Sequence, residues 1–231
     1  MPSPSSTADR WPVCHPAGVA ELPVELTAAQ ARVVGCLLEK ELTTPDAYPM
    51  TLNAVTTACN QTSNRDPVVH WESREVETTL LALKAKGLAR VVHPGSGERA
   101  TKYRQVLDEV LELGAGDRAL VAVLLLRGPQ TVAELRTRTE RLHPFSSPAG
   151  VEAALDALAR RDPPLTARVE RLSGQKEGRW IALLEPGAAE RAATAPPPST
   201  AGRAPGRVDE LEERVAALEE RLAALEQQLG G

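Results

Sequence analysis

The side chains best suited to chemistry in this sequence are basic residues in its second half. Three arginines lie close together and four further basic residues flank a glycine-containing turn: Arg136, Arg138, Arg141, Arg168, Arg171, Lys176 and Arg179. Guanidinium and ammonium groups clustered in this way hold phosphate oxygens without distinguishing one base from another. Four acidic residues are interleaved with them: Glu134, Glu140, Glu170 and Glu177. A solvated surface of ion pairs is therefore the competing interpretation, and nucleic acid is one candidate partner.

A second polar group lies in the first half, where the loop Asn64-Arg65-Asp66-Pro67 follows a predicted helix. Polar side chains on loops often carry binding. The candidate recognition loop consists of Asn60, Asn64, Arg65 and Asp66. Asn and Asp also bond to their own backbone in tight turns, so a structural turn is the alternative interpretation.

Residues that serve as nucleophiles, general bases or metal ligands form no recognisable motif. The cysteines Cys14, Cys36 and Cys59 lack the spacing of zinc ligands, and two of them fall in apolar helical patterns that predict buried free thiols. The four histidines have no carboxylate or nucleophile partner in motif form. The turn at 94–97 lacks the third glycine of a dinucleotide fingerprint, and there is no P-loop. We therefore predict no metal, no cofactor and no enzymatic activity.

Composition excludes two further classes of protein. The 231 residues carry a formal net charge of -4, which argues against binding nucleic acid through bulk positive charge. The longest apolar run, 119–126, is far shorter than the roughly 20 residues that span a bilayer, so no membrane is expected. Residues 1–24 are rich in Pro and Ser without the pattern of a secretion signal. They are predicted to be a disordered leader on a cytoplasmic protein.

Helical periodicity and turn residues predict the elements that would position these groups. Residues 25–108 contain predicted helices at about 27–41, 51–60 and 73–86, then extended stretches at 88–93 and 102–107 around a Gly-rich turn. The first helix begins with a capping box formed by Thr27 and Gln30. Three helices followed by a β-hairpin predict a winged-helix domain.

The same order repeats in residues 109–185. Helices are predicted at 117–127, from Thr131 to 139 and from Ser147 onward, with a hairpin formed by 165–172 and 179–184. Residues 76–83 match 151–158 at five of eight positions, which indicates an ancestral duplication. The predicted fold class is mainly α with small β-hairpins (α+β), in tandem winged-helix domains followed by a coiled coil.

The third helix of a winged helix commonly enters the DNA major groove and needs polar side chains on its outer face. The predicted outer faces carry Arg74, Thr78, Leu81, Ala82 and Ala85 in the first half, and Ala149, Ala153, Asp156, Ala157 and Arg160 in the second. Such faces are poor in groups that bond base edges. Their small side chains either pack against the sister domain or another protein, or simply favour helix.

The C-terminal residues carry the most regular pattern in the chain. Residues 186–206 are rich in Pro, Ala and Gly and predict a flexible linker. Residues 207–229 place apolar side chains at alternating spacings of three and four, as a coiled coil requires: Val208, Leu211, Val215, Leu218, Leu222, Leu225 and Leu229. Flanking pairs such as Arg214 with Glu219 favour a parallel homodimer. The alternative is a solitary amphipathic helix docked on its own domains.

Several stretches of the sequence resemble the YceH family of bacterial proteins. They are residues 31–41, 58–61, 63–68, 126–131 with 134–136, and 174–177. The resemblance runs from about Leu26 to Leu184 and implies a tandem winged-helix fold. It carries no activity over to this chain, because the family is one of unknown function.

These observations predict a dimeric, non-enzymatic binding protein. The leading hypothesis is a regulatory adaptor or scaffold whose rigid tandem winged helices contact an unidentified protein partner. The alternative is a DNA-associated transcriptional regulator that contacts phosphates through the second domain.

Overall fold

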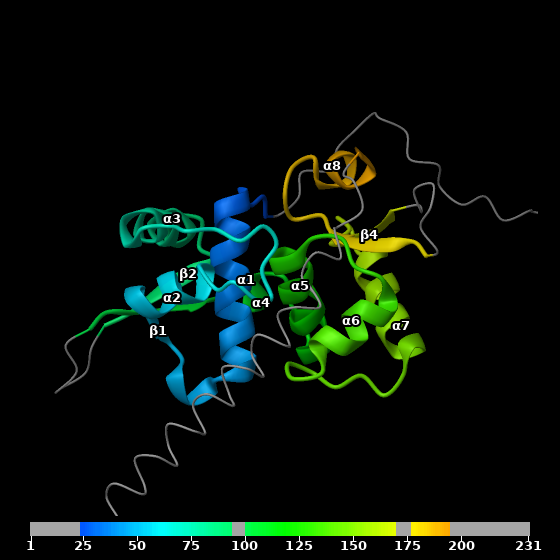
Figure 1. Cartoon of the computed structure of the whole chain (residues 1–231), viewed down its shortest axis with the longest axis horizontal. Coiled ribbons are helices and arrows are strands. Elements are labelled where there is room, and N and C mark those ends of the chain that lie inside the picture. The colour runs from blue at the N-terminus through cyan, green and yellow to red at the C-terminus, as the bar shows by residue number, and fades with distance from the viewer. Residues whose placement is uncertain (1–23, 94–99, 170–176, 195–231) are drawn as a thin grey trace, which may run out of the picture. The chain divides into compact units, whose positions relative to one another are not determined.

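The computed structural model describes residues 24–93, 100–169 and 177–194, which combine α-helices with small antiparallel sheets (Figure 1). Eight α-helices, one 3-10 helix and five strands lie within these ranges. The predicted combination of helices with small β-structure is therefore confirmed. Residues 1–23 of the predicted leader, the tips of both hairpins and the predicted coiled coil lie outside the described residues. Val24, expected in the leader, is buried in the core. All described residues up to Ala193 belong to one compact unit.

The first half contains the three predicted helices and the predicted hairpin. Its elements are α1 (Ala28–Thr43), η1 (Pro45–Ala47), β1 (Met50–Thr51), α2 (Leu52–Cys59), α3 (Ser73–Ala85), β2 (Ala89–Val92) and β3 (Lys102–Gln105). The predicted capping box is present: the N–H of Gln30 donates to Thr27 Oγ1 at 3.3 Å and the N–H of Thr27 donates to Gln30 Oε1 at 3.1 Å. The strands form an antiparallel sheet in the order β1-β3-β2.

The second half repeats this order after a short connecting helix. Its elements are α4 (Leu107–Val110), α5 (Ala115–Arg127), α6 (Val132–Thr139), α7 (Pro148–Ala159), β4 (Thr166–Val169), β5 (Arg179–Ala182) and α8 (Ala188–Thr194). Thr131 caps α6 and Ser147 caps α7, as predicted. Helix α5 stops at Gly128, whose φ of 68° is a conformation that glycine adopts without strain. The sequence did not predict α4, nor α8, which occupies part of the segment expected to be a linker.

The two halves share a structural feature that the match between residues 76–83 and 151–158 does not show. In the first half, β1 pairs with β3 through Met50 and Tyr103, and Thr51 then caps α2. In the second half, Gln130 forms a single β-bridge with Trp180 of β5, with N–H···O distances of 3.0 and 2.7 Å, and Thr131 then caps α6. Gln130 thus takes the place of β1, so each half has the same entry into its second helix.

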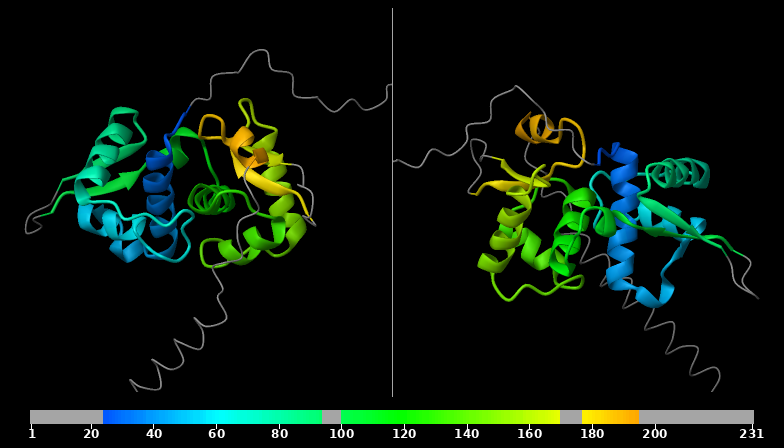
Figure 2. Two further views of the ribbon diagram at one scale, coloured as in Figure 1. Left: turned by 45° about the horizontal axis from the view of Figure 1, so that its top comes forward. Right: turned by 180° about the vertical axis from the view of Figure 1, so that it is seen from behind.

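Helices α1 and α5 lie side by side at the centre of the described unit, with the remaining elements of each half on opposite sides (Figures 1 and 2). Every residue of α1 from Gln30 to Leu38 is buried, and so is every residue of α5 from Ala119 to Leu126. Periodicity predicts only one buried face for α1. The helix is buried all round because its own half covers one side and α5 covers the other.

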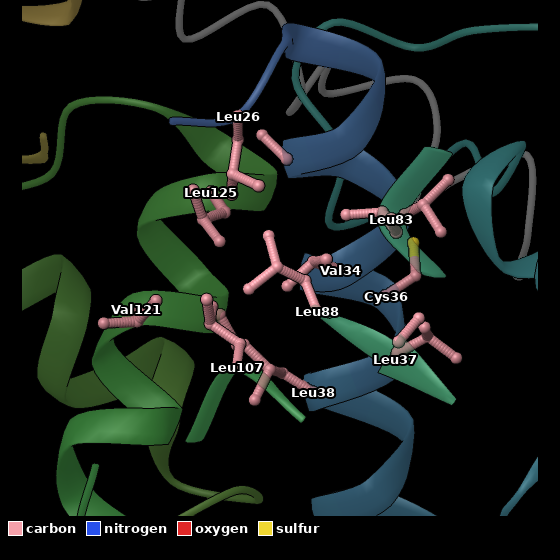
Figure 3. Close-up of a cluster of buried hydrophobic side chains, with 14 of the residues drawn as sticks. Leu26, Val34, Cys36, Leu37, Leu38, Leu83, Leu88, Leu107, Val121 and Leu125 are labelled. Atoms are coloured by element: carbon pink, nitrogen blue, oxygen red, sulfur yellow. The ribbon is translucent and has the colours of Figure 1, made fainter. Parts of the chain in front are cut away.

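One hydrophobic core therefore runs through both halves. Side chains of α1 and α5 contribute to the same buried cluster as Leu26, Leu83 and Leu107 (Figure 3). The helices approach closely at Gly35, where an added Cβ would lie 3.0 Å from carbon atoms of the Leu126 side chain. A second, smaller cluster fills the second half around Leu135, Leu155 and Trp180.

Candidate functional site

A cleft of about 790 Å³ lies between the two halves, at the C-terminal ends of α1, α5 and α6. Its lining comes from α1 (Glu39, Lys40, Thr43, Thr44), the loop after α2 (Gln61, Ser63, Asn64), α5 (Ala122, Val123, Leu126, Arg127) and the end of α6 (Thr137, Arg138, Glu140, Arg141, Leu142). The cleft thus brings part of the candidate recognition loop beside two of the predicted basic residues. Sequence reasoning had placed these groups in separate domains.

Arg65, from the candidate recognition loop, is buried and forms an ion pair behind the cleft wall. Its Nη1 and Nη2 donate to the two carboxylate oxygens of Glu39 at 3.1 and 2.6 Å. Its Nε donates to the carbonyl oxygen of Ala58 at 2.9 Å, and Nη2 also donates to Gln61 Oε1 at 2.7 Å. Burial is the largest effect and acts to lower the pKa of Arg65, but the hydrogen bonds to Glu39, together with the electrostatic influence of Cys36, Glu39 and Cys59, raise the pKa overall. Arg65 therefore organises the loop, because its donors are engaged within the fold.

The other loop residues also make internal bonds. The side chain of Asn60 pairs with the backbone of Trp71, accepting from its N–H and donating to its carbonyl oxygen, both at 2.8 Å. Asn64 adopts a positive φ of 62°, in keeping with the predicted turn. The buried Arg32 of α1 holds the far end of the loop, since its Nη2 donates to the carbonyl oxygen of Pro67 at 2.5 Å.

This loop joins the first half to the second. The backbone N–H of Asp66 donates to the carbonyl oxygen of Leu126 at 2.8 Å, in the last turn of α5. Arg127 of the same turn donates from Nη2 to Asn64 Oδ1. The loop therefore supplies hydrogen-bond partners to the C-terminal end of a helix in the other half, where helix carbonyls lack partners of their own.

Three of the predicted phosphate-binding arginines form ion pairs within the fold. Arg179 Nη1 lies 2.9 Å from Glu134 Oε2, and Arg138 Nη2 lies 3.6 Å from Glu134 Oε1. Arg168 Nη1 lies 3.8 Å from Glu152 Oε1, in an exposed pair. These three side chains therefore have acidic partners within the fold, and phosphate binding by them stays a prediction.

The remaining predicted basic residues differ from these. Arg136 and Arg141 are exposed, and neither forms an ion pair with any described residue. Arg171 and Lys176 lie outside the described residues. Of the predicted set, Arg138 and Arg141 line the cleft.

Arg127 contributes a further positive charge to the cleft. Its side chain is half-buried, and its hydrogen bond goes to the neutral amide of Asn64. Burial lowers the pKa of Arg127, and the nearby charges of Arg138 and Arg65 lower it further, while Glu39 and Glu134 act in the opposite direction. The fold therefore holds several cations close together at this point.

The outer faces of α3 and α7 are uncovered. On α3, Leu81 is 53% exposed, and Thr78 and Ala85 are exposed beside it. On α7, Ala149, Ala153 and Ala157 are all exposed. The opposite sides of both helices, from Val76 to Leu83 and from Val151 to Leu158, supply the buried residues that were predicted. The sister half therefore does not explain the small side chains on the outer faces.

The remaining side chains with reactive or metal-binding groups are the cysteines and the possible metal ligands. Cys36 and Cys59 are buried free thiols, as predicted, whereas Cys14 lies outside the described residues. Within the ranges that the structure covers, no three His, Cys, Asp or Glu side chains gather in a way that could hold a metal ion. None of the helices described is both long and apolar enough to cross a membrane.

Comparison with known proteins assigns the chain to a family. A family profile described as a protein of unknown function, DUF480, matches residues 26–175. The chain belongs to the UPF0502 family, which includes YceH. A UPF0502 protein of Geobacter sulfurreducens is 50% identical over 174 residues, covering 74% of this chain and 78% of that protein. The UPF0502 protein YceH of Salmonella paratyphi A is 45% identical over 194 residues, covering 81% and 90%.

The predicted YceH resemblance is thereby confirmed, and the stretches that carry it contribute residues to the cleft lining. Residues 31–41, 58–61, 63–68 and 126–131 are far apart in the sequence, yet they supply Glu39, Lys40, Gln61, Asn64 and Arg127 to the cleft lining. Sequence reasoning missed Lys40 and Arg127 as site residues in this UPF0502 protein. Their presence in the stretches that carry the resemblance was the available signal.

Proposed function

We propose that the chain is a non-enzymatic binding protein made of two winged helices, which acts as a protein-interaction adaptor or regulatory scaffold. The repeated order of three helices and a hairpin supports the winged-helix assignment. In this assignment α3 and α7 are the third helices, and the β2-β3 and β4-β5 hairpins are the wings. The family comparison is consistent with this role and names no activity.

The exposed outer face of α3 carries the proposal. Leu81 is one of the few large hydrophobic side chains exposed among the described residues, and Ala85 follows one helical turn later. The side chains of leucine and alanine cannot form hydrogen bonds with base edges. They can pack against an apolar protein surface of complementary shape. The corresponding alanines of α7 give the second half a similar face.

Photo-crosslinking tests this proposal. A photoreactive amino acid at Leu81 in the full chain, expressed in its own cells, should give a discrete protein adduct that survives nuclease treatment. Ala85→Glu in the same chain should abolish the adduct, because it places a charge within the contact. The matched control puts the photoreactive group at Asp46, which is exposed in η1. An adduct that disappears with nuclease, or that forms equally from Asp46, would contradict the proposal.

The alternative function is a DNA-associated regulator, and it is favoured by Arg136 and Arg141, which are exposed and form no ion pair with a described residue. If they contact phosphates of duplex DNA, replacing both with Gln should reduce the slope of log affinity against log salt by about 2. Replacing Ala82 and Ala85 with Glu should leave such binding nearly unchanged. An unaltered slope in the arginine variant would leave these side chains as solvated surface.

The proposed scaffold is a homodimer formed by residues 207–229. These residues lie outside the described part of the chain, so the support is the heptad pattern of valine and leucine alone. A parallel pair would hold two copies of the winged-helix unit at one end, each connected through the segment that follows α8.

A further inference from the structure

Arg127 is the starting point, because its positive charge has no carboxylate partner in the described residues. Its hydrogen bond goes to the neutral Asn64 amide, Glu39 and Glu134 act on it without forming an ion pair, and its side chain is only partly exposed to water. Charges removed from water in a protein are normally paired with an opposite charge. A ligand entering from the cleft can supply the missing anion.

The balance of charge along the cleft points in the same direction. Its basic residues are Lys40, Arg127, Arg138 and Arg141, and its acidic residues are Glu39 and Glu140. Both oxygens of Glu39 already accept from Arg65 behind the wall. Outside the lining, Glu134 is shared between Arg138 and Arg179 and therefore cannot neutralise both. Lys40 also lies 3.8 Å from Glu39, yet the positively charged side chains around the cleft still outnumber the negatively charged ones.

The shape of the cleft restricts the kind of anion. Its volume of about 790 Å³ falls within the range typical of sites for small molecules, roughly 300–1,000 Å³. A DNA duplex presents a convex surface, which would contact the rim of such a cleft rather than its floor. The arginines are therefore better placed to surround a small ligand than to follow a nucleic-acid backbone.

The lining also has the chemistry for a phosphate ester. Guanidinium groups match the oxygens of a phosphate group with paired hydrogen bonds. The hydroxyl of Ser63 offers a further donor, whereas those of Thr43 and Thr137 donate to the carbonyl oxygens of Glu39 and Ala133. Ala122, Val123 and Leu126 form an apolar part of the lining. A molecule that carries one phosphate group and a compact apolar body satisfies both parts.

We propose that this cleft binds a small phosphate monoester, with Arg127 and Arg141 contacting the phosphate group and the α5 side chains contacting the body. The site goes beyond the adaptor role, because it gives the chain a ligand that is bound between its halves. A ligand contacting α1, α5, α6 and the 61–64 loop together would strengthen the contact between the two halves.

Phosphorus NMR on the full chain tests the proposal directly. The probes are inorganic phosphate and phenyl phosphate, titrated with protein at constant ionic strength set by chloride. Both phosphorus signals should shift saturably, with phenyl phosphate binding more tightly because its ring contacts the apolar lining. Arg141→Gln should weaken binding at least about tenfold, the scale of one lost charge-assisted contact. Arg141 is exposed and lacks an ion pair with described residues, so this variant should keep its fold.

Matched variants and competitors decide between the remaining outcomes. Arg127→Gln should weaken binding as Arg141→Gln does, whereas Lys84→Gln, which removes one exposed positive charge of α3 outside the cleft, should have no effect. Equal binding by wild type and both arginine variants would overturn the proposal, as would weaker binding of phenyl phosphate than of inorganic phosphate. Displacement of the probe by a 20-base-pair duplex would show a nucleic-acid surface instead, and would equally overturn it.

Discussion

The guanidinium group of Arg65 donates to both carboxylate oxygens of Glu39, at 3.1 and 2.6 Å, and the Arg65 side chain has no solvent-exposed surface. The pair fixes the 60–67 loop to α1. Removing one member of a buried ion pair leaves the other charge without compensation. Arg65→Ala should therefore lower the free energy of unfolding by about 3–5 kcal/mol, as measured by urea denaturation.

An exposed ion pair provides the control for Arg65. Arg90 Nη2 lies 3.1 Å from Glu109 Oε2, with the two side chains 60% and 43% exposed. Arg90→Ala should cost less than about 1 kcal/mol, because Glu109 is exposed to water and keeps its second partner, Arg104. Similar losses in the two variants would show that the Arg65 pair contributes no more than a surface contact.

Tyr48 should make stability dependent on pH in alkaline solution. Its hydroxyl oxygen accepts from the backbone N–H of Gln105 at 2.7 Å. Burial raises the pKa of Tyr48, an effect that the N–H of Gln105 only partly offsets. A tyrosine whose pKa is raised in the folded state contributes stability that is fully present below its unfolded pKa of about 10 and is lost as the pH rises through the folded pKa.

Tyr48→Phe separates the two effects of this hydroxyl. At pH 7 the variant should be less stable by about 1–2 kcal/mol, because the N–H of Gln105 loses its partner. Above pH 10 the wild type should lose stability relative to the variant by about 1.4 kcal/mol per pH unit. Curves of unfolding free energy against pH that stay parallel from pH 7 to 11 would contradict this assignment.

The shared core predicts that the two halves unfold together. Leu155 is fully buried in the second half, so Leu155→Ala should cost about 2–5 kcal/mol. Tryptophan fluorescence can follow each half separately. Trp71 reports on the first half when Trp11 and Trp180 are replaced by Phe, and Trp180 reports on the second half when Trp11 and Trp71 are replaced by Phe. Leu155→Ala should shift the denaturation midpoints of both signals equally. A shift confined to the midpoint of the Trp180 signal would show that the halves unfold separately.

Leu80→Ala should give the same result from the first half, where Leu80 is equally buried.

Gly35 should tolerate no side chain of appreciable size. Gly35→Val would place methyl groups against Leu126 where even a Cβ lies only 3.0 Å away. We expect a loss of about 1–3 kcal/mol, the usual range for overpacking a core. Gly35→Ala should cost less, because a small shift of the Leu126 side chain accommodates one methyl group. Equal stability of Gly35→Val and wild type, measured by thermal unfolding, would show that α1 and α5 can separate slightly.

The proposed coiled coil predicts an oligomeric state that depends on the C-terminal residues. Light scattering should give a dimer for the full chain and a monomer for a chain that ends at residue 206, which retains α8. Leu218→Asp should also give a monomer, because it places a charge in the apolar seam. The control Ala217→Asp alters a position outside the seam and should leave the dimer intact. A dimer that persists in the shortened chain would place the interface elsewhere.

Local signals predicted the helices well because the residues that make them are neighbours. Thr27, Thr131 and Ser147 each cap a helix with a partner three residues away, and Gly128 ends α5 through its own backbone conformation. The full burial of α1 could not be predicted in this way. It depends on α5, which lies about 80 residues later and has no periodic relation to α1.

The cleft could not be predicted from local sequence patterns, for the same physical reason. Arg65 and Glu39 are 26 residues apart, and Arg127 and Asn64 are 63 residues apart, so no spacing rule connects them. Composition also failed to distinguish Arg179, which pairs with Glu134, from Arg141, which makes no ion pair with a described residue. Which charges pair depends on the fold rather than on their order in the sequence.

The bond from the Asp66 N–H to the Leu126 carbonyl oxygen has a consequence for how this protein can evolve. Tandem domains are often portable, so that one copy can be lost, swapped or fused to another gene. Here the last turn of α5 is completed by a loop from the other half, and the apolar sides of α1 and α5 cover each other. Neither half can be inherited alone without exposing those surfaces. The two halves together are therefore the smallest piece of this chain that selection can keep or discard.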